Sequence, residues 1–283
     1  MWSKKMKNNM GVMQGRLLPK YQGRYQAHPI GYWQDEFFQA KEFSLDCIEF
    51  ILDFNDAERN PLLTKGGPLE ILELSSETGV VVKTVCADYF MEAPLHSIEE
   101  SIANKSYKIL QRLIDVAVKI SITDIVIPCV DQSTLNSKEA VERFVVQMKK
   151  IIPTLEKQNI NLSLETDMAP KPFIELLDKL NSRNITVNYD IGNSAALGFD
   201  SDEELEAYGD KISDIHIKDR VLNGGPIILG EGNADFDRFF NKLKEFDYNG
   251  PFIMQAYRDD EGLEVFKKQK EWIKKIIQNS YEG

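Results

Sequence analysis

Four polar side chains stand at the ends of apolar segments in the second half of the chain. Glu165 follows "INLSL", Asp190 follows "ITVNY", His216 lies in "ISDIHIK" and Gln255 in "PFIMQAY". Burying an unpaired carboxylate in such a segment costs several kcal/mol. Two carboxylates, an imidazole and an amide oxygen can together hold a divalent cation and leave positions for water or substrate. We therefore predict a metal site with Mn²⁺ as the preferred ion and Co²⁺, Mg²⁺ or Zn²⁺ as alternatives.

Alternation of side chains along an extended segment supports this site. Glu165, Asp190 and His216 each share a face with the polar residue two positions earlier, while the positions between them are apolar. Gln255 is weaker, since Ile253 shares its face. A single buried His is more often a hydrogen-bonded core residue, and an Asp at a strand end often caps a helix. A metal site is favoured only because polar residues with largely matching alternation stand at the ends of four consecutive segments.

The segments that position these residues alternate along the whole chain. Short apolar stretches predict strands, and the longer amphipathic stretches between them predict helices. The predicted strands are 10–16, 45–51, 79–87, 122–130, 160–166, 185–191, 212–218 and 251–257. The predicted helices are 66–79, 97–120, 171–180, 234–246 and 261–278, with capping boxes at Ser97, Asn136 and Ser201. Eight such units predict an α/β fold, a single (β/α)8 TIM barrel forming one domain over residues 1–283. A doubly wound open sheet is the alternative, because strand patterns alone do not show closure.

Composition narrows the classes of function. The chain has 283 residues and a net charge of −11 without a basic block, which argues against a nucleic-acid partner. No apolar stretch has the length of a signal peptide or a membrane span, so we expect a cytoplasmic protein without a membrane partner. The three cysteines lie far apart in apolar segments and are expected to be buried free thiols.

Further polar residues fall at the predicted carboxyl ends of strands or in the loops after them, where a barrel gathers its chemistry. The candidates for binding substrate are Gln14, Arg16, Glu49, Asp88, Lys218, Asp219 and Arg220. Arg16 could equally form a structural ion pair, and residues 218–220 could form a solvated loop. Gly230 and Gly232 precede a predicted helix and could meet a phosphate through backbone N–H groups, although Glu231 would repel it. The aromatic residues of the long loop at 17–33 either stack on a sugar or pack the loop.

Four ordered blocks carry a family resemblance: "GVMQGRL", "NYDIGNSAALGF", "DIHIKDR" and "LGEGNADFDRFFNKLKEFDYNGPFI". They resemble the xylose-isomerase-like TIM-barrel superfamily, in particular its L-ribulose-5-phosphate 3-epimerase and hexulose-6-phosphate isomerase branch. The resemblance implies a divalent metal held by Glu165, Asp190 and His216. The fourth ligand of the family, a Glu, falls on Gln255. Asn193, where many relatives have His, is assigned to substrate binding.

The resemblance implies an isomerase or epimerase that acts on a ketose or ketose phosphate through a metal-stabilised enediolate. Glu165 is the expected base, and Gln255 occupies the second catalytic position without being able to take a proton. This favours isomerisation on one face over two-base epimerisation, unless Glu49, Asp219 or Glu231 supplies a proton.

Other activities and partners stay open. The alternatives are a metal-dependent sugar or inosose dehydratase and a degenerate, non-catalytic sugar-binding barrel. Three histidines and an acidic charge argue against a three-zinc endonuclease. The expected partner is a small-molecule sugar or sugar phosphate, and a homo-oligomer is left open.

Overall fold

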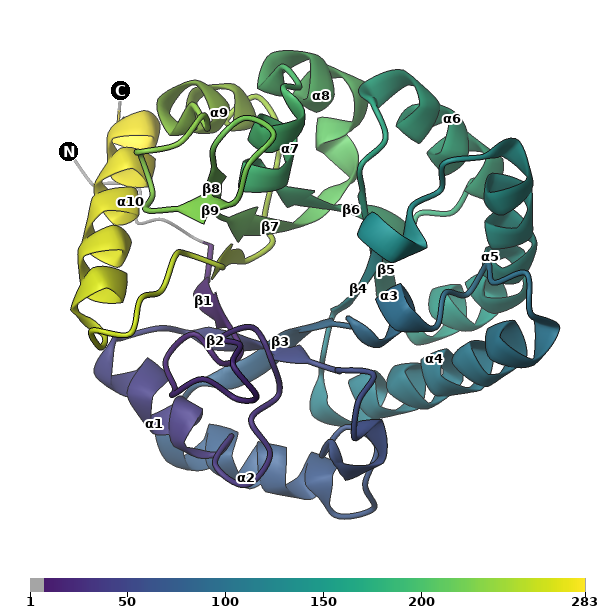
Figure 1. The fold of residues 1–283 in the computed structure, drawn as a ribbon, viewed down its shortest axis with the longest axis horizontal. Coiled ribbons are helices and arrows are strands. Elements are labelled where there is room, and N and C mark those ends of the chain that lie inside the picture. Colours follow the sequence, from purple (N-terminus) through teal and green to yellow (C-terminus); the bar gives the residue numbers. More distant parts are fainter. Residues whose placement is uncertain (1–7, 283) are drawn as a thin grey trace.

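The structure, a computed structural model, describes residues 8–282 and is built on a closed barrel of eight parallel strands (Figure 1). Around the barrel the strands follow the order β1, β10, β7, β6, β5, β4, β3, β2. Their bounds are β1 Met10–Met13, β2 Cys47–Ile51, β3 Val81–Cys86, β4 Asp124–Cys129, β5 Asn161–Thr166, β6 Ile185–Asp190, β7 Ile212–Ile217 and β10 Phe252–Met254. Each strand lies inside a predicted segment, so the predicted (β/α)8 barrel is confirmed and the open sheet is wrong.

Helices form a ring around the strands, as Figure 1 shows. They are α1 Asp35–Glu42, α2 Gly67–Thr78, α3 Tyr89–Glu92, α4 Glu100–Ile120, α5 Lys138–Gln158, α6 Pro170–Leu180, α7 Ile191–Leu197, α8 Ser201–Tyr208, α9 Phe236–Leu243 and α10 Glu264–Glu282. Three short 3₁₀ turns (Ala57–Arg59, Asp131–Ser133, Gly209–Lys211) and a two-stranded ribbon of β8 Asp219–Arg220 and β9 Pro226–Ile227 complete the elements. Among the described helices, none is long and apolar enough to cross a membrane.

The predicted helix starts are close to the observed ones but use different caps. Ser137 instead of Asn136 caps α5, and Asp200 instead of Ser201 caps α8. Ser97 accepts a backbone N–H outside α4, whose cap position makes no side-chain hydrogen bond. The predicted capping boxes were therefore wrong in their detail: a neighbouring side chain takes the backbone donors at α5 and α8, and no side chain caps α4.

The barrel interior is divided into an apolar side and a polar side. The apolar side is a small cluster, separate from the main core, of Met13, Cys47, Ile51, Cys86, Val126 and Ile253. The polar side comes mainly from β5, β6 and β7, where Ser163, Glu165, Asn188, Asp190, Asp214 and His216 are all buried, and it includes the buried Glu49, Thr84 and Asp124 of β2, β3 and β4. Outward-facing neighbours such as Leu162 and Leu164 pack in the main core between strands and helices. The three cysteines are buried and free, as predicted.

Candidate functional site

Three predicted metal ligands come together at the carboxyl ends of β5, β6 and β7. Glu165, Asp190 and His216 each offer one ligand atom, and these atoms all lie within 4.8 Å of one another. The three residues are 7%, 5% and 0% exposed. His216 Nδ1 lies 3.9 Å from Asp190 Oδ2. The predicted alternation therefore does converge on one place.

A register shift between Val187 and Asn188 helps to build this cluster. Beyond the shift, Asp190 on β6 pairs with His216 on β7. Without the extra residue Asp190 would pair with Ile215, whose side chain faces away from the interior. Such bulges redirect side chains and are frequent beside active sites.

Asn193 and Lys218 fix the two carboxylates. Asn193 Nδ2 donates to Glu165 Oε1 at 2.6 Å, and its backbone N–H donates to Asp190 Oδ1 at 2.8 Å. Asp190 thus also caps α7, which was the structural alternative for this residue. Lys218 Nζ donates to Asp190 Oδ2 at 3.2 Å, and Arg220 Nη1 donates to Asn193 Oδ1 at 2.9 Å. Lys218, Arg220 and Asn193 therefore border the cluster.

Burial and crowding shift the acidities of the cluster. Burial, with the nearby Asp190 carboxylate, raises the pKa of Glu165 to about 7. For His216, burial opposes the charged ring, but Glu49, by charge and hydrogen bond, outweighs it together with Glu165 and Asp190. The net effect raises the pKa of His216 to about 9.

Gln255 is hydrogen-bonded to Gln26, a residue for which the sequence predicts no role. Gln255 Nε2 donates to Gln26 Oε1 at 2.7 Å, and Arg16 Nη2 donates to the same oxygen at 3.2 Å. Gln26 Nε2 in turn donates to Asp88 Oδ2 at 3.3 Å. The long loop after β1 therefore carries Gln26 to the barrel mouth. Nothing in the local sequence distinguishes Gln26, because its partners Asp88 and Gln255 lie 62 and 229 positions away.

The donor set fits a divalent cation. Within residues 8–282, His216 Nδ1 and Gln255 Oε1 are buried and have no hydrogen-bond partner. A buried polar atom without a partner costs free energy unless something binds it. An imidazole nitrogen beside two carboxylates, in a barrel mouth that also holds an unpaired carboxamide oxygen, matches the ligand preferences of Mn²⁺, Co²⁺ or Zn²⁺.

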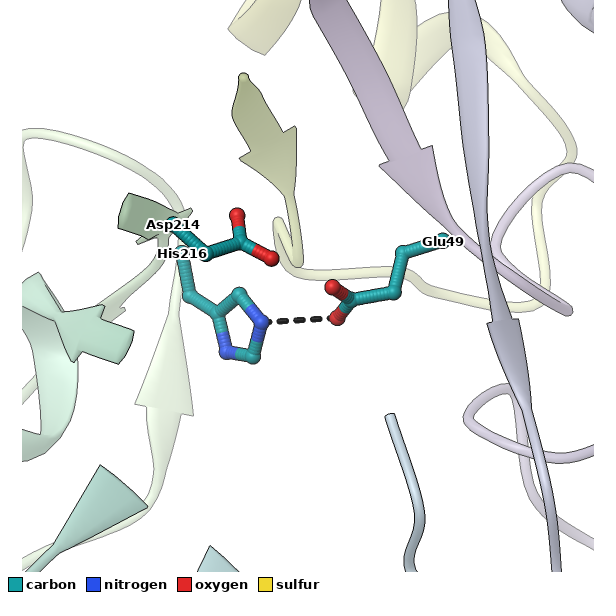
Figure 2. A group of neighbouring side chains, drawn as sticks. All are labelled: Glu49, Asp214 and His216. Atoms are coloured by element: carbon teal, nitrogen blue, oxygen red, sulfur yellow. Dashed lines mark hydrogen bonds and ion pairs between the residues drawn. The ribbon is translucent and has the colours of Figure 1, made fainter. Parts of the chain in front are cut away.

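Glu49 lies in the middle of β2 and not at the carboxyl end of the strand, which was its predicted position. It is fully buried, with Oε1 2.7 Å from His216 Nε2 and Oε2 accepting from Thr84 Oγ1 at 2.6 Å. Figure 2 shows Glu49 reaching across to His216, with Asp214 beside the ring. Glu49 therefore has partners inside the barrel and is not a loop residue.

The Asp219 carboxylate is hydrogen-bonded to backbone N–H groups of its own loop. Its carboxylate accepts backbone N–H groups from Gly230, Gly232 and Ala234 at 2.9–3.1 Å. A Cβ on Gly232 would lie 2.2 Å from Asp219 Oδ1, which explains the glycine. The prediction that Gly230 and Gly232 bind a phosphate through these N–H groups is wrong, because Asp219 already occupies them.

The loop after β1 is packed down mainly by its aromatic residues. His28 and Trp33 are 3% and 5% exposed and both contact Phe50. Gln14 Oε1 accepts the backbone N–H of Ile51 at 3.0 Å and lies 3.1 Å from His28 Nδ1. His28 and Trp33 therefore pack the loop against the barrel and are not placed to stack on a sugar. Gln14 anchors this loop through its contacts with Ile51 and His28.

Known proteins share this sequence pattern and fold. The family described as xylose isomerase-like TIM barrel matches residues 37–276. The L-ribulose-5-phosphate 3-epimerase UlaE of Escherichia coli is 27% identical over 259 residues, 86% of this chain and 89% of the relative. The UlaE protein of Salmonella heidelberg is 26% identical over 257 residues, with 86% and 89% coverage.

Solved structures share the fold at low sequence identity. A D-tagatose 3-epimerase-like protein superposes with a TM-score of 0.75 at 18% identity, covering 97% of this chain and 98% of that one. The IOLI protein with a bound zinc atom gives 0.74 at 14% identity, covering 96% and 99%. A Mycobacterium smegmatis protein in complex with magnesium gives 0.72 at 17%, covering 99% and 100%. The predicted resemblance is confirmed: the chain belongs to the xylose isomerase-like TIM barrel family.

Proposed function

We propose that the protein is a divalent-metal-dependent isomerase or epimerase that acts on a ketose or ketose phosphate. The observation that carries this proposal is the cluster of Glu165, Asp190 and His216 at the barrel mouth, with unsatisfied ligand atoms on His216 and Gln255. The curated relatives named above are L-ribulose-5-phosphate 3-epimerases, which supports a sugar substrate. Both kinds of reaction begin with removal of a proton from a carbon beside a carbonyl.

Glu165, Asp190, His216 and Gln255 would hold the metal. When bound, a divalent cation supplies Lewis-acid polarisation of the substrate's carbonyl and adjacent hydroxyl oxygens. Glu165 is the base in this proposal, since a carboxylate at the mouth of the barrel can take a proton from carbon and give it back. The hydrogen bond from Asn193 Nδ2 holds one Glu165 oxygen in place and so orients the carboxylate.

The fate of the proton decides between isomerisation and epimerisation. Gln255 cannot donate an acidic proton, while Glu49 and Asp219 are engaged by His216 and by backbone N–H groups. Glu231 is exposed on its loop. These placements favour delivery of the proton by Glu165 to the former carbonyl carbon on the same face, while the proton of the neighbouring hydroxyl passes to the former carbonyl oxygen, which converts a ketose to an aldose.

Epimerisation is the second candidate, because the curated relatives are named 3-epimerases. It needs an acid on the opposite face of the substrate. Asp88 is the carboxyl group linked through Gln26 to Gln255, and burial raises its pKa. In this second candidate, Asp88 supplies the proton that Gln255 cannot.

Arg16 favours a phosphorylated substrate. In the described part of the chain no carboxylate lies within ion-pair distance of its guanidinium, and its buried Nε has no partner. Arginines in such surroundings are rarely left without an anion. The expected structural ion pair is thus missing, and a substrate phosphate would provide the counter-charge.

The test is an NMR screen of pentuloses, hexuloses and their phosphates in D₂O with Mn²⁺, which is removed before detection. Deuterium at the carbon next to the carbonyl, with an aldose as product, supports the isomerase, and a 3-epimer supports the second candidate. Loss of a hydroxyl identifies a dehydratase. Absence of exchange for every sugar, while the protein still binds them, leaves a sugar-binding barrel and refutes the proposal.

Asp88→Asn separates the two candidates. It should abolish formation of a 3-epimer if Asp88 is the second acid, while proton exchange by Glu165 continues. Equal epimer formation by the variant would refute the role of Asp88.

A further inference from the structure

We propose that Glu49 is a positioning residue that holds the His216 ring with Nε2–H toward β2 and Nδ1 free toward Glu165 and Asp190. The inference rests on the proposed metal site but concerns residues on the opposite side of the ring. Glu49 belongs to β2 and His216 to β7, and Figure 2 shows the two side chains meeting inside the barrel.

The contact between Glu49 and His216 is short and fully shielded from solvent. Glu49 Oε1 lies 2.7 Å from His216 Nε2, and both side chains are 0% exposed. A carboxylate only accepts, so Nε2 must carry the hydrogen. The remaining nitrogen, Nδ1, is buried without a partner in the described structure and lies on the side of Asp190. One bond therefore selects both the tautomer and the orientation of the ring.

Glu49 is itself held in place by the strand next to it. Thr84 Oγ1 on β3 donates to Glu49 Oε2 at 2.6 Å. The pairing of β2 with β3 shifts between Ile48 and Glu49, so that Glu49 pairs with Thr84 and not with Lys83. This bulge puts the threonine hydroxyl next to the carboxylate. The arrangement is a chain from Thr84 through Glu49 to His216.

Metal-binding histidines usually donate their second ring N–H to a carboxylate or carbonyl, which fixes the tautomer and strengthens the ligand. Loss of such a partner typically weakens metal binding by about 10- to 100-fold. Glu49, Asp214 and His216 also lie within 4.8 Å of one another by their ligand atoms. Because the Glu49–His216 contact is a direct hydrogen bond, we assign Glu49 to support of one metal site and not to a second metal.

Zinc binding and histidine NMR test this assignment without any sugar. Zn²⁺ affinity is measured by competition with a chromophoric chelator for the wild type, Glu49→Gln and Glu204→Gln. Glu204 is a matched control, since it is 3% exposed and hydrogen-bonded to Tyr189, Ser194 and Tyr208, none of which we assign as a ligand. We expect the Kd for Zn²⁺ to rise about 10- to 100-fold in Glu49→Gln and to stay within about twofold in Glu204→Gln.

Long-range ¹H–¹⁵N spectra of the zinc-loaded wild type give the tautomer directly, since the chain has three histidines. We expect His216, assigned by its loss in His216→Gln, to carry hydrogen on Nε2. Hydrogen on Nδ1, two zinc ions per chain, or unchanged affinity in a folded Glu49→Gln would overturn the inference. If Glu49→Gln does not fold, the wild-type spectrum still decides. A wild type with the expected tautomer but no sugar exchange would refute the proposed function alone.

Discussion

His28 should make the protein less stable as the pH falls from 7 to 5. The ring packs between Trp33 and Phe50, with ring centroids 5.9 and 5.5 Å away, and is 3% exposed. Burial lowers the pKa of His28 to about 3. The folded pKa is therefore below the unfolded value, so its stabilising contribution is complete above about pH 6.5. That contribution is lost progressively as the pH falls toward the folded pKa.

The size of the effect follows from proton binding by the unfolded chain. Between pH 6.5 and pH 5 the unfolded histidine takes up a proton while the folded one does not. Each pH unit in this range costs about 1.4 kcal/mol, which gives a loss of about 2 kcal/mol at pH 5. A folded pKa one unit higher would leave this figure nearly unchanged, because the folded ring would still be neutral at pH 5.

Urea unfolding of the wild type and His28→Phe at pH 7 and pH 5 measures this contribution. Phe fills the aromatic site and does not titrate, and Ile51 still donates to the Gln14 oxygen that His28 contacts. The loss of unfolding free energy between the two pH values should be smaller in the variant by about 2 kcal/mol. EDTA in all samples removes any contribution from metal binding. Equal losses in both proteins would refute the argument that His28 is buried neutral.

Three further substitutions address the site. Glu165→Gln should lower the rate of sugar proton exchange by about 10²- to 10⁴-fold in a protein that still folds, and exchange at the wild-type rate would show that another base acts. Gln255→Glu introduces a second carboxyl group and should raise the ratio of 3-epimer to aldose in the NMR product analysis, whereas an unchanged ratio would show that this position does not deliver the proton. Asp219→Asn leaves backbone donors of the Gly230–Gly232 turn unsatisfied and should lower the urea unfolding free energy by about 1–3 kcal/mol. Wild-type stability would show that water replaces the carboxylate.

The barrel could be predicted because each strand is a compact apolar segment bounded by polar residues. The segment that forms α1 gave no such signal, since Phe37 is fully buried while the adjacent Phe38 is 41% exposed. The boundaries of α5 and α8 were off by one residue, because Ser137 and Asp200 compete with their neighbours for the same backbone donors. Sequence pattern thus located elements better than it located their ends.

The convergence of Glu165, Asp190 and His216 could be predicted because side-chain alternation is a local property. Roles that depend on partners far away in the sequence could not be predicted. Glu49 bonds to a residue 167 positions away, and Gln26 to one 229 positions away. The two register shifts that bring Glu49 and Asp190 to their partners leave no mark in the local pattern. Asp219 looked available at the mouth because its backbone donors come from a later part of the loop.

The division of the barrel interior has a consequence for engineering. Met13, Cys47, Ile51, Cys86, Val126 and Ile253 form the apolar side, while the polar side lies mainly on β5, β6 and β7. Mutant libraries directed at the apolar side, leaving out Cys86 because its thiol donates to Asp88 at 3.1 Å, would explore thermal tolerance at constant chemistry. Libraries on the polar side would change turnover and selectivity. Substitutions there that lower the free energy of unfolding would be compensated only by a ligand that binds the folded protein.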